Sequence, residues 1–389
     1  MYKMLKITSN FLILIILFHF FACAPKKPKE NLIYKKVNEK QIERLIKSTD
    51  ITVQGLSSWK ELDRPLLDTS RYLYRKGAKD ICIQNQCIST PLLKETIDRF
   101  VEILPELDRD ANIIKDKFEF YKLTPKTFFT GYFEMDVNAS LTRDKEYRYP
   151  IYGLPSDLKK VNLGRFHPRW RGQTLIYRIE GDEIRPYYSR KEIDGEHKIK
   201  GKAPVLAWAK SLVDIYFLQI QGSGRLILPD GSFKYIGYAG KNGRQYVSLG
   251  KYLIEKGYIT PDQGNLEGIV NYLNSNPDKL PDILFINPSY VFFRFLDCGP
   301  VGAIGVKLMP LVSIAVDPEI IPLGSIGIYE VKLPGMDKEM MGFFIAQDVG
   351  GAIENNHVDL FCGFGENARH IAGNLSQYGN IYLMLKKEK

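Results

Sequence analysis

From Thr124 onward, the chain consists of short runs of strand-forming residues separated by Gly, Pro, Asn and Asp. A second series of such runs begins at about Val291. Aromatic residues favour strands, and the sequence holds 23 Tyr and 21 Phe beside 32 Gly and 21 Pro. This pattern is typical of β-barrels or sandwiches joined by tight turns.

Helical periodicity dominates the chain before Thr124. Residues 37–120 place apolar side chains at three- and four-residue spacing, and shorter helical patterns return at residues 247–257 and 266–276. A chain of 389 residues is long enough for two or three domains with sizeable cores. We therefore predict a mainly β protein with helices.

The N-terminal segment has the features of a bacterial export signal. Lys3 and Lys6 precede an apolar run over residues 11–21, and a small residue then comes directly before Cys23. The apolar run is short for a membrane span. The Cys resembles that of a lipobox, in which the thiol is lipidated and becomes the first residue of the mature protein.

Residues 1–23 are accordingly predicted to be a lipoprotein signal segment, and residues 24–36 a tether. Phe20 stands where a lipobox usually has Leu. An uncleaved anchor and a simple secreted protein therefore stay open as alternatives.

The other cysteines favour structural roles. Cys82 and Cys87 are spaced to close a small loop by a disulfide in an exported protein. Cys298 and Cys362 lie in apolar, glycine-containing segments and are predicted to be buried thiols. No His pair has the spacing of a metal site, so we predict neither a metal nor a cofactor.

The charge is basic and spread along the chain. A net charge of +9 suits an anionic polymer or a membrane surface. No nucleic-acid-binding motif is present, so nucleic acid is not a predicted partner.

Two aspartates flank a Gly-Gly turn within residues 346–365. Residues 342–348 and 358–364 are predicted strands, so that the loop joining them brings Asp348 and Asp359 together. Asp348 is typical of a turn residue whose carboxylate caps the loop backbone. Asp359 alternates with two apolar neighbours, and partial burial on a concave face would raise its pKa enough for proton donation.

A third acid, Asp317, ends another predicted strand. Because Pro318 follows it, a turn is the plainer interpretation.

An ordered series of segments resembles the successive motifs of the membrane-bound lytic murein transglycosylase A family. These segments are FFTGYFE, YYSR, LAWAKSLVDIYFLQIQGSGRL, IGYAGKNGRQYVSLG, NPSYVFFR, GPVGAIGVKLMPLVSIAVDPEIIPLGS, AQDVGGAI and VDLFCGFG. The C-terminal part resembles the family's 3D domain, whose three aspartates match Asp317, Asp348 and Asp359.

The resemblance implies a particular fold. A double-psi β-barrel domain with helices would comprise residues 37–130 and 244–389, with the 3D domain at about 291–375. Residues 131–243 would form an inserted second β-barrel, with a glycan groove between the two domains.

The resemblance also implies non-hydrolytic cleavage of the MurNAc-β-1,4-GlcNAc bond of peptidoglycan, which leaves 1,6-anhydro-MurNAc ends during cell-wall turnover. The catalytic acid falls on Asp359, with Asp348 and Asp317 as supporting residues. Hydrolytic glycosidases usually need two carboxylates. In this reaction the sugar's own C6 hydroxyl is the nucleophile, so one Asp can act first as acid and then as base.

Four residues are candidates for substrate binding. Gln219, Gln221 and Ser223 could hydrogen-bond sugar groups, and Tyr132 could provide a stacking platform. If the segment is a strand, the alternate spacing of Gln219 and Gln221 places both on one face. Each of the four could instead be structural.

The sequence departs from the family pattern in the loop before Asp359. Val349 stands where Thr is frequent, residues 354–355 where Lys-Gly is frequent, and His357 where Arg is frequent. With an unperturbed pKa, His357 would change charge near pH 6.5. The alternative interpretation is that His357 is simply an exposed loop residue.

Two other functions stay open. An inverting glycan hydrolase would use Asp359 as acid and Asp348 as base, and a non-catalytic lipoprotein would only bind peptidoglycan. The predicted location is the outer membrane, facing the periplasm, with peptidoglycan strands as partner and membrane contact through a lipid on Cys23.

Overall fold

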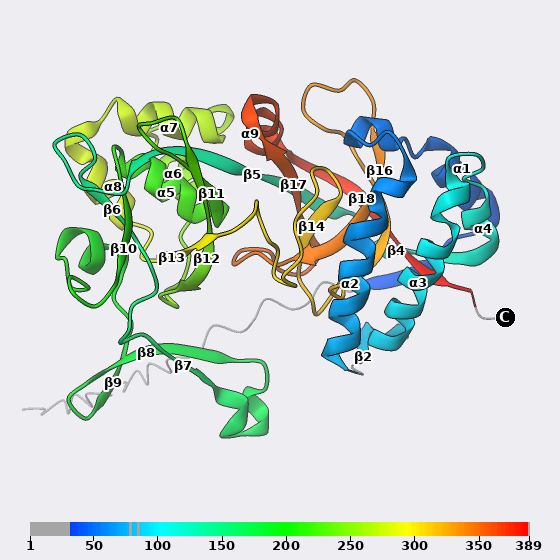
Figure 1. Ribbon diagram of the computed structural model, residues 1–389, viewed down its shortest axis with the longest axis horizontal. Coiled ribbons are helices and arrows are strands. Elements are labelled where there is room, and N and C mark those ends of the chain that lie inside the picture. Colours follow the sequence, from blue (N-terminus) through cyan, green and yellow to red (C-terminus); the bar gives the residue numbers. More distant parts are fainter. Residues whose placement is uncertain (1–31, 78–79, 84–85, 388–389) are drawn as a thin grey trace, which may run out of the picture. The chain divides into compact units, whose positions relative to one another are not determined.

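The computed structural model describes residues 32–77, 80–83 and 86–387. Within these residues, one sheet of 13 strands runs through the fold, beside a two-stranded and a three-stranded sheet (Figure 1). The signal segment predicted for residues 1–23 lies outside the described residues. No helix in the described part of the chain is long and apolar enough to cross a membrane.

Within its described residues, the part predicted to be helical contains four α-helices. They are α1 (Glu39–Ser48), α2 (Asp63–Lys76), α3 (Thr90–Leu107) and α4 (Ile113–Lys117). Asn38 and Ser89 cap the N-termini of α1 and α3, which explains where these two helices begin. Buried residues on α1, α2 and α3 join the main hydrophobic core.

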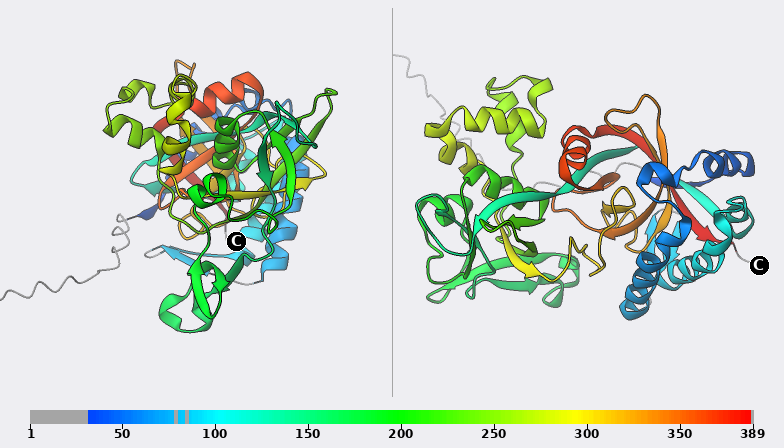
Figure 2. Two further views of the ribbon diagram at one scale, coloured as in Figure 1. Left: turned by 90° about the vertical axis from the view of Figure 1, so that its left-hand side faces the viewer. Right: turned by 45° about the horizontal axis from the view of Figure 1, so that its top comes forward.

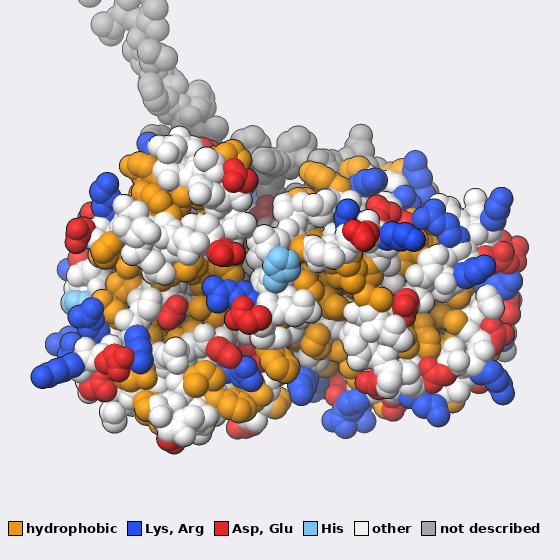
Figure 3. Space-filling model, turned by 90° about the horizontal axis from the view of Figure 1, so that it is seen from above, with side chains coloured by type: hydrophobic (Ala, Val, Ile, Leu, Met, Phe, Trp, Pro, Cys, Tyr) orange, Lys and Arg blue, Asp and Glu red, His pale blue; other side chains and the backbone are white. Residues whose placement is uncertain are grey.

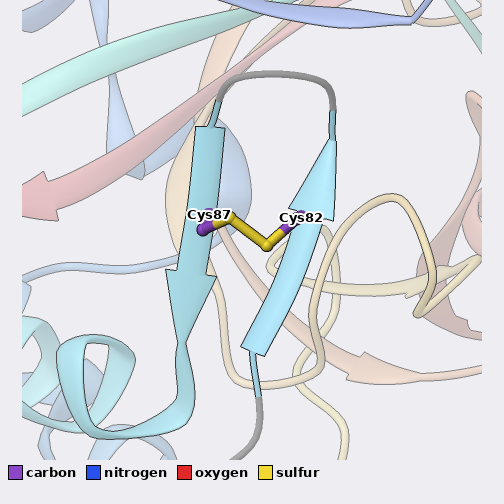
Figure 4. Close-up of a disulfide and its surroundings, with 2 residues drawn as sticks. All are labelled: Cys82 and Cys87. Atoms are coloured by element: carbon purple, nitrogen blue, oxygen red, sulfur yellow. A yellow bond between two sulfur atoms is a disulfide. The ribbon is translucent and has the colours of Figure 1, made fainter.

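Strands interrupt this helical part, contrary to the prediction for residues 37–120. The hairpin of β2 (Asp80–Ile83) and β3 (Gln86–Ser89) is closed by a disulfide between Cys82 and Cys87 (Figure 4). In addition, β4 (Phe118–Thr124) and β1 (Ile33–Lys36) pair with each other. Because β1 is a strand, the fold begins within the segment predicted to be a tether.

Six strands close into a first barrel. In spatial order they are β5 (Thr127–Ser140), β17 (His357–Phe364), β14 (Ser313–Val316), β16 (Met340–Asp348), β15 (Ile326–Val331) and β18 (Ser376–Lys386). The ring closes because β18 also pairs with β5. Strand β15 shows how closely the ladder packs, since a Cβ on Gly327 would lie 2.1 Å from the carbonyl oxygen of Tyr382.

A second barrel uses the other end of β5. Its further strands are β11 (Ser223–Ile227), β12 (Phe233–Lys241), β13 (Val291–Leu296), β6 (Tyr149–Tyr152) and β10 (Val205–Ala209). A parallel bridge between Gly153 and Phe293 links the β6 and β13 sides. Its core is a separate cluster that includes Val137, Leu226 and Ile236.

Further helices pack beside the second barrel. These are α5 (Leu212–Gln221), α6 (Leu249–Glu255), α7 (Leu266–Asn274) and α8 (Leu280–Phe285). Each of them contributes buried residues to one shared cluster, and α5 also contributes to the core of the second barrel. A small sheet of β7 (Lys159–Asn162), β8 (Thr174–Glu180) and β9 (Glu183–Pro186) completes this part.

These contacts differ from the predicted domain boundaries. Because α6 to α8 pack with α5, and β13 pairs with β12, residues 249–296 lie with the insert rather than with the first barrel. The boundary predicted between residues 130 and 131 falls inside β5, which continues from one barrel into the other (Figure 2).

Candidate active site

Asp359 lies in the wall of the first barrel. It is on β17, opposite Thr130 of β5 on one side and Ala315 of β14 on the other. Its neighbours Val358 and Leu360 are fully buried, and the Asp359 side chain points to the opposite face, as alternation requires. The Thr130 hydroxyl donates a hydrogen bond of 2.7 Å to Oδ1 of Asp359.

The surroundings of Asp359 favour its protonated form. Burial raises its pKa to about 7, and the nearby charge of Asp348 acts in the same direction, while the Thr130 hydrogen bond opposes them. A carboxyl group with such a pKa is protonated in a large fraction of molecules near neutral pH, and it can also accept a proton back.

Asp348, at the end of β16, is tied to three donors. Oδ1 accepts hydrogen bonds of 2.9 Å from the backbone N–H groups of Ala303 and Val349. Oδ2 accepts a hydrogen bond of 2.8 Å from the hydroxyl of Tyr132. Burial raises the pKa of Asp348, whereas these hydrogen bonds lower it. The carboxylate thus caps the Gly-Gly loop and holds Tyr132 in place.

Asp317 holds the other end of the same loop. It follows β14, and its two oxygens accept hydrogen bonds from the backbone N–H groups of Glu319 (3.0 Å) and Asn355 (2.8 Å). Asn355 has a φ of 57°, a left-handed conformation that costs energy for most residues. Asn tolerates this conformation better than most residues, and Asp317 fixes it two residues before His357.

Tyr132 contacts the site from inside the wall. The residue is only 8% exposed, and its ring lies 5.3 Å from that of Phe361. The prediction of an open stacking platform is therefore wrong, because the ring has little free surface. Its contribution is the hydrogen bond to Asp348.

The segment of Gln219 and Gln221 is a helix, so the prediction that they share a strand face is wrong. Gln219 is 5% exposed within α5. Gln221 is the last residue of α5, and its Oε1 accepts a hydrogen bond of 2.9 Å from the backbone N–H of Phe133. Ser223 begins β11. Within the described residues, no hydrogen bond joins Gln219, Gln221 or Ser223 to the three aspartates.

Three further residues line this part of the barrel. Thr130 and Glu134 were not predicted for the site, whereas His357 was noted as a position that could alter substrate contacts. Thr130 bonds Asp359, and its hydroxyl oxygen also lies 2.9 Å from Nε2 of His357. His357 starts β17 and is half-buried, so it is not an exposed loop residue. Glu134 lies on the same face of β5 as Thr130 and Tyr132, and burial raises its pKa to about 7. Alternation around the FFTGYFE motif is the one sequence signal for Thr130 and Glu134.

The other sequence predictions concern cysteines, metals and charge. Cys362 is buried as predicted, but Cys298 is exposed. No group of three His, Cys, Asp or Glu side chains in the described residues could hold a metal ion. On the face shown in Figure 3, basic side chains are interspersed with acidic ones and form no continuous basic track.

Two family models match the chain. Residues 128–294 match the MltA specific insert domain, and residues 312–385 match the 3D domain. The first match covers the second barrel and its helices, and the second covers the strands that carry Asp317, Asp348 and Asp359.

Relatives and solved structures agree with these matches. Over 262 residues the chain is 32% identical to membrane-bound lytic murein transglycosylase A of Vibrio cholerae, covering 65% of this chain and 64% of that protein. The protein of the same name from Escherichia coli K12 is 32% identical over 264 residues, covering 66% and 65%. The aligned part thus spans less than two thirds of either relative.

A crystal structure of MltA from Neisseria gonorrhoeae superposes with a TM-score of 0.71 at 28% identity, covering 92% of this chain and 94% of that one. The fold and site define a two-barrel protein with three aspartates in one barrel wall. The chain belongs to the membrane-bound lytic murein transglycosylase A family, with a 3D domain over residues 312–385.

The hydrogen bonds of Asp348 make a specific prediction. Asp348→Asn keeps an oxygen for the two backbone donors but removes the charge, and its amide faces the Tyr132 hydroxyl. Hydrogen bonds to charged groups are each worth about 1.5–3 kcal/mol, so we expect any activity that depends on this loop to fall about 10- to 100-fold but to persist. The measurement is product release from purified murein. Loss as complete as that of an Asp359 variant, in a folded protein, would contradict the positioning role.

Proposed function

We propose that the protein is a peptidoglycan lytic transglycosylase, which cleaves the MurNAc-β-1,4-GlcNAc bond and leaves 1,6-anhydro-MurNAc ends. The observation that carries this proposal is the contrast between two neighbouring carboxyl groups. Asp348 has hydrogen bonds on both oxygens, while among the described residues Asp359 accepts one on Oδ1 alone. One acid, with a pKa of about 7, is thus available for proton transfer.

The chemistry needs no second carboxylate. Protonated Asp359 gives its proton to the glycosidic oxygen as the bond to the anomeric carbon breaks, and positive charge develops on the sugar ring. The resulting carboxylate then takes the proton from the C6 hydroxyl, whose oxygen attacks the anomeric carbon. Because nucleophile and electrophile belong to one sugar, proximity replaces the activated water of a hydrolase.

Asp348 and Asp317 support the reaction through the loop that they fix at its two ends. We place the glycan along the face of β5 that carries Thr130, Tyr132 and Glu134, which continues from Asp359 toward the second barrel. In this arrangement Gln221 acts indirectly by bonding the β5 backbone. Direct sugar contacts of Gln219 and Ser223, and the groove between the barrels, remain predictions.

An inverting hydrolase would need a base to activate water. Asp348 is the nearby candidate, but its oxygens already accept three hydrogen bonds and hold a loop. The products decide between the mechanisms. Mass spectrometry of purified murein after digestion should show 1,6-anhydro-MurNAc ends, and reducing MurNAc ends would exclude the proposal. If the folded protein released no products from murein, non-catalytic glycan binding would be the function left open.

We further propose that the protein is attached to the cell envelope as a lipoprotein, with the lipid on Cys23 and the outer membrane as its site. The named relatives are membrane-bound proteins, and the basic, apolar, Ala-Cys order at the N-terminus is typical of a lipobox.

Lipidation can be tested with one substitution. Cys23→Ala is expected to block processing at residue 23 and to prevent lipid incorporation, measured by labelled fatty acid and by membrane fractionation. Cys298→Ala removes an exposed thiol elsewhere and serves as control. If the Cys23→Ala protein were processed and retained in membranes as the parent is, the lipoprotein assignment would be abandoned.

A further inference from the structure

Three side chains form a hydrogen-bonded row that ends at Asp359. Nε2 of His357 lies 2.9 Å from the Thr130 hydroxyl oxygen, which lies 2.7 Å from Oδ1 of Asp359. His357 and Asp359 project from the same face of β17, with Thr130 opposite on β5. The histidine is therefore linked to the reacting acid through one hydroxyl group.

The imidazole has further contacts besides Thr130. The ring forms a hydrogen bond with the backbone of Ala352 and lies 5.2 Å from the ring of Phe128. This backbone bond raises the pKa of His357, as expected when a ring N–H donates to a carbonyl oxygen, but burial has the larger effect and lowers the pKa. Near neutral pH the neutral form of the ring is therefore favoured.

The Thr130 hydroxyl has one hydrogen and two neighbours that can accept it. If Nε2 of neutral His357 accepts this hydrogen, an ionised Asp359 receives no hydrogen bond from Thr130. A protonated Asp359 can instead donate its own hydrogen to the Thr130 oxygen, so that all three side chains are hydrogen-bonded. If His357 is protonated, Nε2–H donates to Thr130, whose hydrogen then bonds the Asp359 carboxylate. The two arrangements hold the same number of protons.

Resting on the transglycosylase function proposed above, we propose that His357 is a positioning residue that controls, through Thr130, whether Asp359 carries a proton. Neutral His357 competes with the Asp359 carboxylate for the Thr130 hydrogen and so favours the protonated acid that begins the reaction. When Asp359 has given up its proton, the Thr130 hydroxyl turns toward the carboxylate and stabilises it. In this row only Asp359 exchanges a proton with the substrate, and His357 acts on it through Thr130.

Three other titratable groups face Asp359, and substitutions at His357 or Thr130 leave them unchanged. Asp348 faces it from β16, Tyr132 from β5 and Cys362 from β17, while β14 contributes the uncharged Ala315. Their influence on the Asp359 pKa is thus common to parent and variants.

Two substitutions in the full-length protein should move the Asp359 pKa in opposite directions. In His357→Phe the Thr130 hydrogen is left to the carboxylate, so the pKa of Asp359 should fall by about one unit. In Thr130→Val the carboxylate loses its donor, so the pKa should rise by a similar amount. His357→Gln restores an acceptor for Thr130 and should return the pKa toward that of the parent.

The measurement is the carboxyl ¹³C shift of Asp359 against pH, assigned by comparison with Asp359→Asn. His370→Phe, on the exposed side of α9 (Gly365–Asn374), is the control for loss of a histidine. An Asp359 pKa in His357→Phe equal to that of the control, or shifted upward, would overturn the inference. If His357→Phe does not fold, His357→Leu, which also offers Thr130 no acceptor, takes its place with the same expected direction.

Activity gives an independent readout. The alkaline limb of kcat/KM on murein should move to lower pH in His357→Phe and to higher pH in Thr130→Val. A shift of the Asp359 pKa without any transglycosylase activity in the parent would refute the proposed function and leave the coupling intact. Normal activity with no shift would refute the coupling alone.

Discussion

Asp359→Asn is expected to abolish release of 1,6-anhydro products while leaving glycan binding intact. The amide can neither donate a proton to the glycosidic oxygen nor take one from the C6 hydroxyl. General acid–base assistance contributes about 10²–10⁴-fold, and the unactivated sugar leaving group places the loss at the upper end of this range or beyond. Thr130 can still donate to the amide oxygen, so the barrel wall should keep its geometry.

The experiment gives purified murein to both proteins, with binding measured by sedimentation and products by mass spectrometry. A nearby conservative variant, Glu366→Gln on the exposed start of α9, controls for handling and folding. Substantial release of 1,6-anhydro ends by Asp359→Asn would remove Asp359 from its assigned role. Lost binding together with lost turnover would mean that the substitution damages the site itself.

The second large effect is on stability, through the same carboxyl group. The pKa of Asp359 is about 7 in the folded protein, against 3.8 for an unperturbed Asp, so the folded state holds a proton that the unfolded chain releases. The stabilisation due to this proton is fully present below about pH 3.8 and is lost as pH rises through about 7. The difference of about three units corresponds to at most about 4 kcal/mol.

Asp359→Asn has no such proton to lose. Relative to the variant, the parent should therefore become less stable in urea between pH 5 and pH 8, while Glu366→Gln should follow the parent. Both free energies of unfolding are taken from denaturation curves at each pH. Parallel pH dependence of the parent and Asp359→Asn would show that the carboxyl group is not appreciably desolvated.

Much of the fold could be predicted because β alternation is local. The runs around Asp348 and Asp359 are strands, and the loop between them is held by Asp348, as turn chemistry indicates. The two barrels were expected from the family resemblance. Their shared use of β5 was not, since a strand that changes partners along its length has the same residue pattern as one that does not.

The α5 helix shows where local pattern fails. Nearly every residue from Val213 to Gln219 is buried, so the helix has no polar stripe and its apolar run resembles a strand. The signals at its ends were more informative. Ser211 caps the N-terminus, and Gly222 ends the helix with a φ of 78°.

The His357–Thr130 contact could not be predicted from spacing either. The two residues are 227 positions apart and meet because β17 runs parallel to β5. The parallel register depends on barrel closure, and no short segment encodes it. Cys298 was misjudged for a similar reason, because apolar neighbours in sequence do not decide which side of a loop is covered.

Strand β5 belongs to both barrels, so the number of residues along it sets the spacing between them. Thr130 pairs with Asp359 of β17, and six residues further along β5 Asp136 pairs with Arg225 of β11. One residue added between these points would turn every later side chain to the opposite face, so the second barrel would bury its polar face. Two added residues would restore the faces but shift the register along the strand. The spacing between the reacting acid and the insert is therefore set in whole residues, and homologous inserts can be exchanged only where this count is kept.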